Sequence, residues 1–312
     1  MVCYPTSVSR SIKAHLLLVL VTFAWGVTFV AIKNALVSVS PLVFNALRMA
    51  SASVALLLIF RNELKELNKD TALGGMLLGV FLWTGYSFQT VGLKFTTPSK
   101  SAFITGMFVV VVPLIIAMSG RRLPNRWTLV GVVCAFVGLY LMTIVPTSAK
   151  GGQLWGTVSR GDLLTLGCPI SFALHIFTQS KLLKRYPFKP LAVMQILTAT
   201  VLMVITISLE TPRLVLTGQA VFAILFTGLI CTAAAFSIQA WAQQFTPPTH
   251  TALIFVLEPV FAGLTSYVLL GEHLGARGTI GAMLILSGIL VSELKGSSVE
   301  PSKAFDAEFS IN

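Results

Sequence analysis

Long apolar segments alternate with short polar stretches along almost the whole chain. A transmembrane helix needs about 20 predominantly apolar residues, and ten segments are long enough. We predict ten membrane-spanning helices, at residues 14–32, 41–60, 71–93, 99–118, 127–145, 162–183, 190–209, 218–243, 249–270 and 276–294. The pattern indicates an all-α membrane protein with short loops.

The composition excludes a soluble domain. Hydrophobic residues make up 55% of the 312 residues and charged residues only 11%, and the mean hydropathy is +0.86. In soluble domains the charged share is usually about 25%. A soluble fold built from this chain would lack the polar side chains to cover its surface.

The net charge of +11 reflects membrane orientation rather than nucleic-acid binding. Basic residues stand singly or in short clusters between apolar segments, where cytoplasmic loops collect Lys and Arg. With the N-terminus inside, inner segments hold 14 Lys and Arg, outer segments hold 7, and Arg48 lies within a span. We therefore predict that both termini are cytoplasmic and that the chain binds no nucleic acid.

No motif for metal, nucleotide or covalent chemistry is present in the sequence. Cys134, Cys168 and Cys231 lie in apolar segments and Cys3 lies near the start, without the spacing of metal ligands or of a disulfide framework. No glycine-rich stretch has the spacing of a phosphate-binding loop followed by Lys and Ser or Thr. We expect no cofactor, no metal, no catalytic residues and no ATPase activity.

The chain contains an internal duplication. Residues 97–123 read as a diverged copy of 246–274, and smaller matches align Trp25 with Phe172 and Gln89 with Gln239. The predicted units are a first five-helix half (14–145), a joining loop (146–161), a second half (162–294) and a polar tail (295–312). Because five is odd, the second half inserts upside down, and such inverted repeats support alternating access.

The chain resembles the EamA-type permeases of the drug/metabolite transporter superfamily. The resemblance covers roughly residues 12–295 and rests on the order and spacing of TFAWGVTFVAIK, TTPSKSAFITGMFVVVVPL, GDLLTLGCPISFALHIF and LEPVFAGLTSYVLLGEHL. It implies ten helices in two five-helix halves. It also implies a carrier in the bacterial inner membrane, often an exporter of amino acids or related metabolites, sometimes of drugs.

One polar stripe lies on the predicted helix 162–183. Gly167, Ser171, His175 and Gln179 follow one another at steps of four and therefore share a face. Polar groups within a span face a cavity or a partner helix. Ser171, His175 and Gln179 either bind substrate or hold helices together through hydrogen bonds.

Other spans combine aromatic residues with amides and hydroxyls. The candidates are Trp25, Thr28 and Phe29 in 14–32, Tyr86 and Gln89 in 71–93, and Phe236 and Gln239 in 218–243. Apolar walls with few polar groups suit a small zwitterionic or planar metabolite. Aromatic residues are also common packing material in spans. Trp25 is the favoured aromatic candidate because its neighbour Gly26 permits close backbone approach.

Two charged residues interrupt the apolar segments. Glu258 in 249–270 is a candidate for proton coupling, but it also suits a structural role beside Pro259 or a pair with Arg48. Pro113 and Pro259 are candidate hinges, because proline removes a helical hydrogen bond. Gly131, Gly138, Gly281 and Gly288 pack either within one chain or across a homodimer.

These features predict a secondary transporter of small organic metabolites such as amino acids, working as an exporter by alternating access. Its partners are a small-molecule substrate and the lipid bilayer. One alternative is an intramembrane lipid-modifying enzyme that uses His175 and Glu258 as acid and base. Another is a drug-efflux carrier of the same fold.

Overall fold

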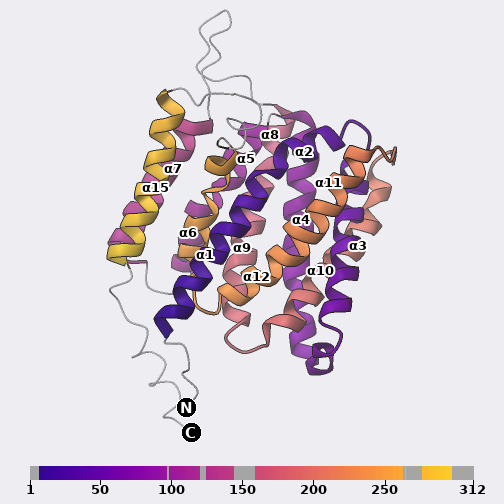
Figure 1. Ribbon diagram of the computed structural model, residues 1–312, viewed down its shortest axis with the longest axis horizontal. Helices are drawn as coiled ribbons and strands as arrows, with labels where there is room; N and C mark the ends of the chain where they lie inside the picture. The colour runs from indigo at the N-terminus through magenta and orange to yellow at the C-terminus, as the bar shows by residue number, and fades with distance from the viewer. Residues whose placement is uncertain are drawn as a thin grey trace, which may run out of the picture.

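The computed structural model describes residues 7–96, 98–119, 124–143, 159–262, 264 and 276–296. These residues form a bundle of helices, with one isolated antiparallel bridge between Val39 and Leu214. Figure 1 shows the helices side by side, with α7 (Arg126–Thr143) and α15 (Ala276–Gly296) paired at one flank. Most of the loop 146–161, most of the tail 295–312 and parts of the copies 97–123 and 246–274 lie outside the described residues.

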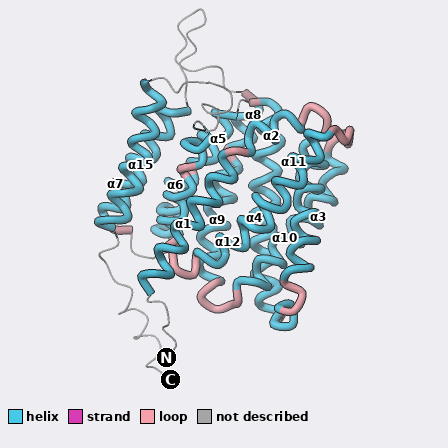
Figure 2. The backbone as a smooth tube through the Cα atoms, in the orientation of Figure 1, coloured by secondary structure: helices cyan, strands magenta, loops and turns pink. Residues whose placement is uncertain are grey.

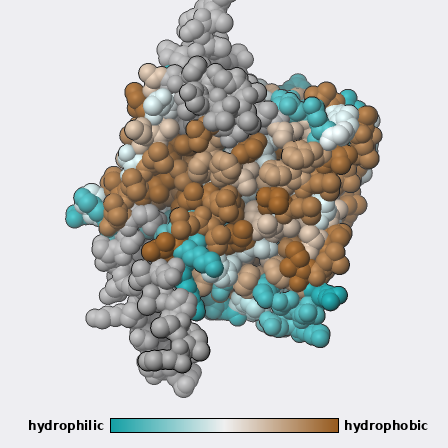
Figure 3. Space-filling view, in the orientation of Figure 1, coloured by the Kyte–Doolittle hydropathy of each residue, from teal (hydrophilic) through white to brown (hydrophobic). Residues whose placement is uncertain are grey.

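Seven helical stretches are long and apolar enough to cross a membrane. They are Arg10–Ala35, Pro41–Ile59, Lys69–Phe95, Ser101–Met118, Arg160–Leu182, Phe188–Leu209 and Gly218–Ala242. The predicted segments 127–145, 249–270 and 276–294 contain shorter apolar helices, Arg126–Leu141, Pro248–Ala262 and Ala276–Ser292. Every predicted segment therefore contains an apolar helix. Figure 3 shows the resulting apolar belt, with hydrophilic residues at its lower edge.

Several spans are built from more than one helix. The single-helix spans are α3 (Pro41–Ile59), α4 (Lys69–Phe95), α7, α10 (Phe188–Thr206, followed by the short η2, Ile207–Leu209) and α15. The interrupted ones are α1 (Ser7–Gly26) with α2 (Thr28–Ala35), α5 (Pro98–Gly106) with α6 (Phe108–Met118), α8 (Arg160–Thr165) with α9 (Gly167–Leu182), and α11 (Gly218–Gly228) with η3 (Leu229–Ala234) and α12 (Ala235–Ala242). The helix α13 (Pro248–Phe255) ends just before Glu258, and η1 (Glu63–Glu66) lies in a loop. Figure 2 shows how short the described loops are.

Three helix starts among the described residues illustrate capping by side chains. Asn68 accepts a hydrogen bond from Thr71 N at the start of α4, and Ser159 forms a capping box with Asp162 at the start of α8. At the start of α3, the Glu210 carboxylate accepts from Leu42 N at 2.8 Å and Val43 N at 3.2 Å. Such caps supply partners for backbone N–H groups that have none within the helix.

The end of α4 is capped by a lysine from the first span. Lys33 Nζ donates to Leu93 O at 2.5 Å and to Thr96 O at 2.9 Å. The ammonium therefore satisfies carbonyls at a helix C-terminus, where a positive charge is favourable. Lys33 thereby ties α2 to α4.

Glycines bring α7 and α15 into backbone contact within one chain. A Cβ added to Gly131 would lie 2.5 Å from Gly288 O, and one added to Gly138 would lie 2.5 Å from Gly281 O. Between helices in lipid, close packing replaces the hydrophobic effect as a driving force, and small residues permit it. These four glycines therefore pack within the chain and are not available as a homodimer surface.

Candidate functional site

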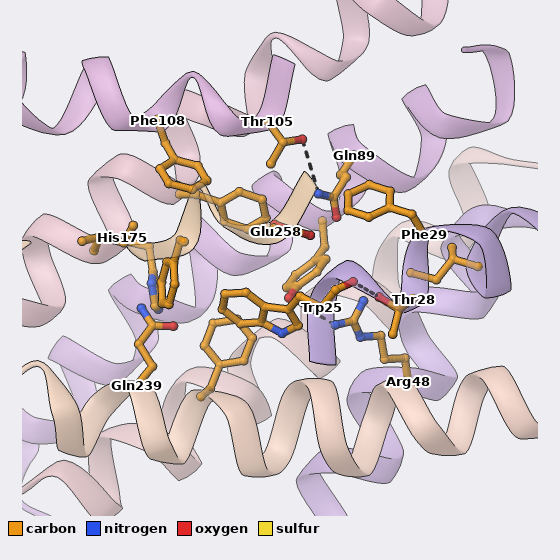
Figure 4. Close-up of a pocket in the computed structure, with 16 residues that line it drawn as sticks. Trp25, Thr28, Phe29, Arg48, Gln89, Thr105, Phe108, His175, Gln239 and Glu258 are labelled. Atoms are coloured by element: carbon orange, nitrogen blue, oxygen red, sulfur yellow. Dashed lines mark hydrogen bonds between the residues drawn. The ribbon is translucent and has the colours of Figure 1, made fainter. Parts of the chain in front are cut away.

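A cavity lies in the middle of the bundle, where the first, second, third, fourth, sixth, eighth and ninth spans meet. It contains about 570 Å³ of atom-free space, part of it open to the exterior. Its lining residues are Trp25, Thr28, Phe29, Ile32, Arg48, Tyr86, Gln89, Thr105, Phe108, Phe172, His175, Ile176, Phe236, Gln239, Phe255 and Glu258. Figure 4 shows that one positive and one negative side chain, Arg48 and Glu258, enter this cavity.

Arg48 is held in place by partners on two other spans. Its Nε donates to Thr232 Oγ1 at 2.7 Å, and its Nη2 donates to Tyr86 Oη at 3.2 Å and to Cys231 O at 3.3 Å. The guanidinium also lies 4.3 Å from the centre of the Tyr86 ring. Arginine has five N–H donors. Among the described residues, the two donors on Nη1 have no partner, so a ligand in the cavity can use them.

The π-helical segment η3 supplies the carbonyl on which this arrangement depends. Ala235 N donates to Ile230 O, five residues back, instead of to Cys231 O as in an α-helix. Cys231 O accepts from Arg48 and from Trp25 Nε1, which lies 2.8 Å away. Single turns of π-helix occur frequently at functional sites. Here the turn directs a backbone acceptor toward the cavity wall.

Glu258 enters the cavity where the ninth span is broken. Val256 and Leu257 form a turn after α13, and Pro259 lies in the first turn of the helical segment that follows, where proline is well tolerated. A Cβ added to Gly26 would lie 2.6 Å from Glu258 O, so the first and ninth spans touch through their backbones. Within the described part of the chain, the Glu258 carboxylate has no hydrogen bond and no ion pair within 4.0 Å, including to Arg48.

Aromatic rings form the walls between the two charges. Trp25 lies 5.7 Å from Phe236 and 4.9 Å from Phe255, measured between ring centres. Tyr86 lies 5.3 Å from Phe172 in an edge-to-face arrangement, which is a favourable geometry for aromatic pairs. The cavity therefore combines an apolar interior with few polar groups, as small-molecule sites do.

Comparison with known proteins identifies the family. A model of the EamA-like transporter family matches residues 12–144 and 159–294. The chain belongs to the EamA-like transporter family. It is therefore a multi-pass membrane transporter of the drug/metabolite transporter type, as the sequence resemblance implies.

Relatives of this EamA-family transporter cover most of its length. A protein of Archaeoglobus fulgidus named as an uncharacterized transporter is 32% identical over 287 residues, covering 92% of this chain and 87% of that protein. The uncharacterized transporter YoaV of Bacillus subtilis is 26% identical over 290 residues, covering 90% of this chain and 97% of that protein. One solved crystal structure superposes with a TM-score of 0.74 at 16% identity, covering 91% and 97% of the two chains, and shows the same fold.

The structure brings most of the candidate residues of this EamA transporter together. Those that line the cavity are Trp25, Thr28, Phe29, Tyr86, Gln89, His175, Phe236, Gln239, Arg48 and Glu258. Ser171 does not, because its hydroxyl donates to Gly167 O in its own helix at 2.9 Å. Gln179 is fully buried one turn beyond His175. Within the described residues, no three His, Cys, Asp or Glu side chains could together hold a metal ion.

The two candidate hinge prolines differ in position. Pro259 is the second residue after the turn at Val256 and Leu257. Pro113 lies inside the helix α6, and the break in that span falls at Met107, where the amide donates to Ile104 O in a tightened turn. The fourth span therefore bends before its proline, and a hinge role for either proline stays a prediction.

Other lining residues were not assigned to the site from the sequence. They are Ile32, Thr105, Phe108, Phe172, Ile176 and Phe255. A signal for three of them exists in the duplication, because Phe172, Ile176 and Phe108 align with the candidates Trp25, Phe29 and Glu258. Taken singly, an aromatic or aliphatic residue in a span carries no sign that it faces a cavity.

His175 both lines the cavity and bonds a neighbouring helix. Its ring lines the cavity and lies 5.6 Å from Phe236, while its Nε2 lies 2.8 Å from Gln195 Oε1 in a hydrogen bond between α9 and α10. The bond is buried, so it also serves as an interhelical contact.

Replacing His175 with Phe is expected to destabilise the protein by about 1–3 kcal/mol, because Gln195 Oε1 loses its buried partner. Gln195→Leu should cause a similar loss. The double variant should lose less than the sum of the two by about 0.5–3 kcal/mol, as expected for residues in contact. Thermal denaturation of the four purified proteins measures this coupling. Additive losses would show that the hydrogen bond contributes nothing.

Proposed function

We propose that this transporter is a secondary, non-ATP carrier that exports small zwitterionic metabolites such as amino acids by alternating access. The observation that carries the proposal is that one aromatic cavity contains a positive and a negative side chain, each with polar atoms that no described residue bonds. Arg48 keeps two free donors, and Glu258 presents a carboxylate without a hydrogen bond among the described residues. Export is the direction that the sequence resemblance implies.

A zwitterion satisfies both charges at once. Its carboxylate accepts from Arg48 Nη1, in the charge-assisted geometry that guanidinium favours, and its ammonium group lies against Glu258. The apolar remainder of the molecule then contacts rings such as those of Trp25 and Phe236. A charge buried without a partner is costly, so a ligand with only one charge leaves the other cavity charge unmatched. Glu258 is also our candidate for the coupling proton.

The cavity lining supports an inverted repeat. The alignment of the two halves that pairs Trp25 with Phe172, and Gln89 with Gln239, also pairs other lining residues with one another. The resulting pairs are Trp25–Phe172, Thr28–His175, Phe29–Ile176, Tyr86–Phe236, Gln89–Gln239, Thr105–Phe255 and Phe108–Glu258. Arg48 and Ile32 are the two lining residues whose aligned residues in the other half do not line the cavity. Two halves that contribute equivalent residues to one central site are the arrangement that alternating access requires.

Further contacts are related in the same way. The Trp25–Phe236 pair at 5.7 Å corresponds to the Phe172–Tyr86 pair at 5.3 Å. Aligning the two halves also relates the two glycine contacts between α7 and α15, because the Gly131–Gly288 contact corresponds to the Gly281–Gly138 contact. The breaks in the fourth and ninth spans fall at Met107 and at the aligned Leu257. The family model matches one stretch in each half, which supports the division into 14–145 and 162–294.

We place the protein in a bacterial inner membrane with both termini in the cytoplasm. The start of α1 and the end of α15 lie on one side of the bundle in Figure 1. The loops on this side carry clusters of basic residues such as Arg61, Lys65, Lys184 and Arg185. An excess of Lys and Arg marks the cytoplasmic side.

A thermal-shift series with four related probes tests the proposal. A ligand that binds only the folded protein raises its melting temperature. Phenylalanine carries both charges, phenethylamine only the positive one, 3-phenylpropionate only the negative one, and ethidium represents a cationic drug. We expect phenylalanine to give the largest shift. A second assay should then show counterflow of labelled phenylalanine in proteoliposomes. A larger shift with phenethylamine or ethidium would favour the drug-efflux alternative, and equal shifts would remove the zwitterion assignment.

A further inference from the structure

The cavity is not symmetric at its two ends. Under the match between the halves, Ile32 on α2 corresponds to Gln179 on α9. Ile32 lines the cavity, whereas Gln179 lies outside it and has no exposed surface. The cavity therefore extends further toward the end where α2 lies than toward the end where α9 terminates. In Figure 1 these are the upper and lower ends of the bundle.

The closed end contains a group of buried glutamines, which we call the glutamine cluster: Gln179, Gln195, Gln239 and Gln243. Gln195 bonds His175, one turn before Gln179, and Gln239 Nε2 lies 3.5 Å from Gln243 Oε1. Gln243 Nε2 donates to Ile176 O at 3.3 Å, which links α12 to α9. The glutamine cluster therefore joins α9, α10 and α12 at the closed end of the cavity, where Gln239 forms part of the lining.

The glutamine cluster has an unusual number of unpartnered polar atoms. Both side-chain polar atoms of Gln179, Gln195 Nε2 and Gln239 Oε1 are buried without a hydrogen bond among the described residues. Each such group costs about 1–3 kcal/mol relative to a partnered one. Glutamines that served only to hold helices together would leave fewer of these atoms unpartnered, since each amide offers two donors and an acceptor. The arrangement instead fits side chains that meet water or substrate in another conformation.

We propose that the glutamine cluster is the closed half of the transport path. In the opposite conformation α9 and α12 separate, Gln179 lines the cavity and contacts water or substrate polar groups, and Ile32 becomes buried at the other end. The proposal rests on the alternating access proposed above. It adds a second polar passage, lined by amides, that an exported substrate crosses on its way from the cytoplasm to Arg48 and Glu258.

Cysteine accessibility tests this passage without any substrate. In a background with the four native cysteines replaced by Ala, Ile32→Cys, Gln179→Cys and the control Ile196→Cys are treated with a membrane-impermeant maleimide in sealed vesicles of each orientation. Ile196 is fully buried on α10, next to Gln195. Ile32→Cys should react from one face only. Gln179→Cys should react only from the other face, at about 0.1–10% of that rate, because minor conformations have populations of this order.

Two results would overturn the proposal. One is reaction of Gln179→Cys from the same face as Ile32→Cys. The other is reaction of Gln179→Cys, from either face, no faster than that of Ile196→Cys. A second measurement serves if the cysteine variants do not fold. Gln179→Leu removes two unpartnered groups and should raise the melting temperature above that of wild type, whereas a lower melting temperature would indicate a structural role. Because neither readout uses a ligand, failure here is distinguishable from failure of the probe series.

Discussion

Replacing Arg48 with lysine is expected to weaken the binding of phenylalanine, so that its melting-temperature shift appears only at much higher concentrations. Lysine keeps the charge but offers one ammonium group in place of a planar fork. It cannot bond Thr232, Tyr86 and the Cys231 carbonyl while presenting two parallel donors to a carboxylate. A hydrogen bond to a charged group contributes about 1.5–3 kcal/mol, which corresponds to a loss of affinity of about 10- to 150-fold.

The matched control is Arg160→Lys, at the exposed first residue of α8. It should leave both the melting temperature and the phenylalanine response unchanged. Dose–response curves of the thermal shift for wild type and both variants give the affinities. An unchanged affinity in Arg48→Lys would show that the guanidinium does not bind the substrate carboxylate and that its role is to join the second, third and eighth spans.

Replacing Gly131 or Gly138 with alanine is expected to destabilise the protein by about 1–3 kcal/mol, near the upper end of that range. The added Cβ would meet a backbone carbonyl oxygen at 2.5 Å in each case. Backbone cannot rotate away as a side chain can, so α7 and α15 must separate along their contact. The loss should exceed the gain of about 0.5–1 kcal/mol that alanine brings to a helix in place of glycine.

Gly218→Ala is the control for this prediction, because a Cβ at Gly218 would meet nothing within 4 Å. Surface changes of that kind stay within about 0.5 kcal/mol. Chemical or thermal denaturation in the same detergent compares the three variants. Equal stability of Gly131→Ala and Gly218→Ala would mean that α7 and α15 are not held in backbone contact.

Much of the fold could be predicted from apolar runs alone. In a bilayer every backbone group must be bonded within the chain, so a long apolar run has to be helical. The interruptions at Val27, Met107 and Leu166 were not predicted, because the glycine beside each of them is by itself tolerated within a helical pattern. They depend on how each half-helix packs against its neighbours. The break before Pro259 had a stronger sign in the sequence, the proline itself.

The candidate site was partly visible for a related reason. A polar or charged residue inside a span is costly, so Arg48, His175 and Glu258 stood out. Of the polar side chains in the stripe at steps of four, only His175 lines this cavity. Gln179 lies buried one turn beyond it, and Ser171 bonds its own helix. The π-helical turn that exposes the Cys231 carbonyl has no sequence signature, although Arg48 and Trp25 both depend on it.

The π-helical turn also sets the number of residues in the eighth span. η3 holds its hydrogen bonds to the fifth preceding residue, so it carries one residue more than an α-helical turn of the same height. Deleting one residue there would restore an α-helical turn of the same height, so α12 would keep its orientation relative to α11. The Cys231 carbonyl would then accept from the amide four residues later and would be lost as an acceptor for Arg48 and Trp25. A chimaera that grafts this span from a relative must therefore match its residue number as well as its side chains, or the graft will insert correctly and lack this acceptor at the cavity wall.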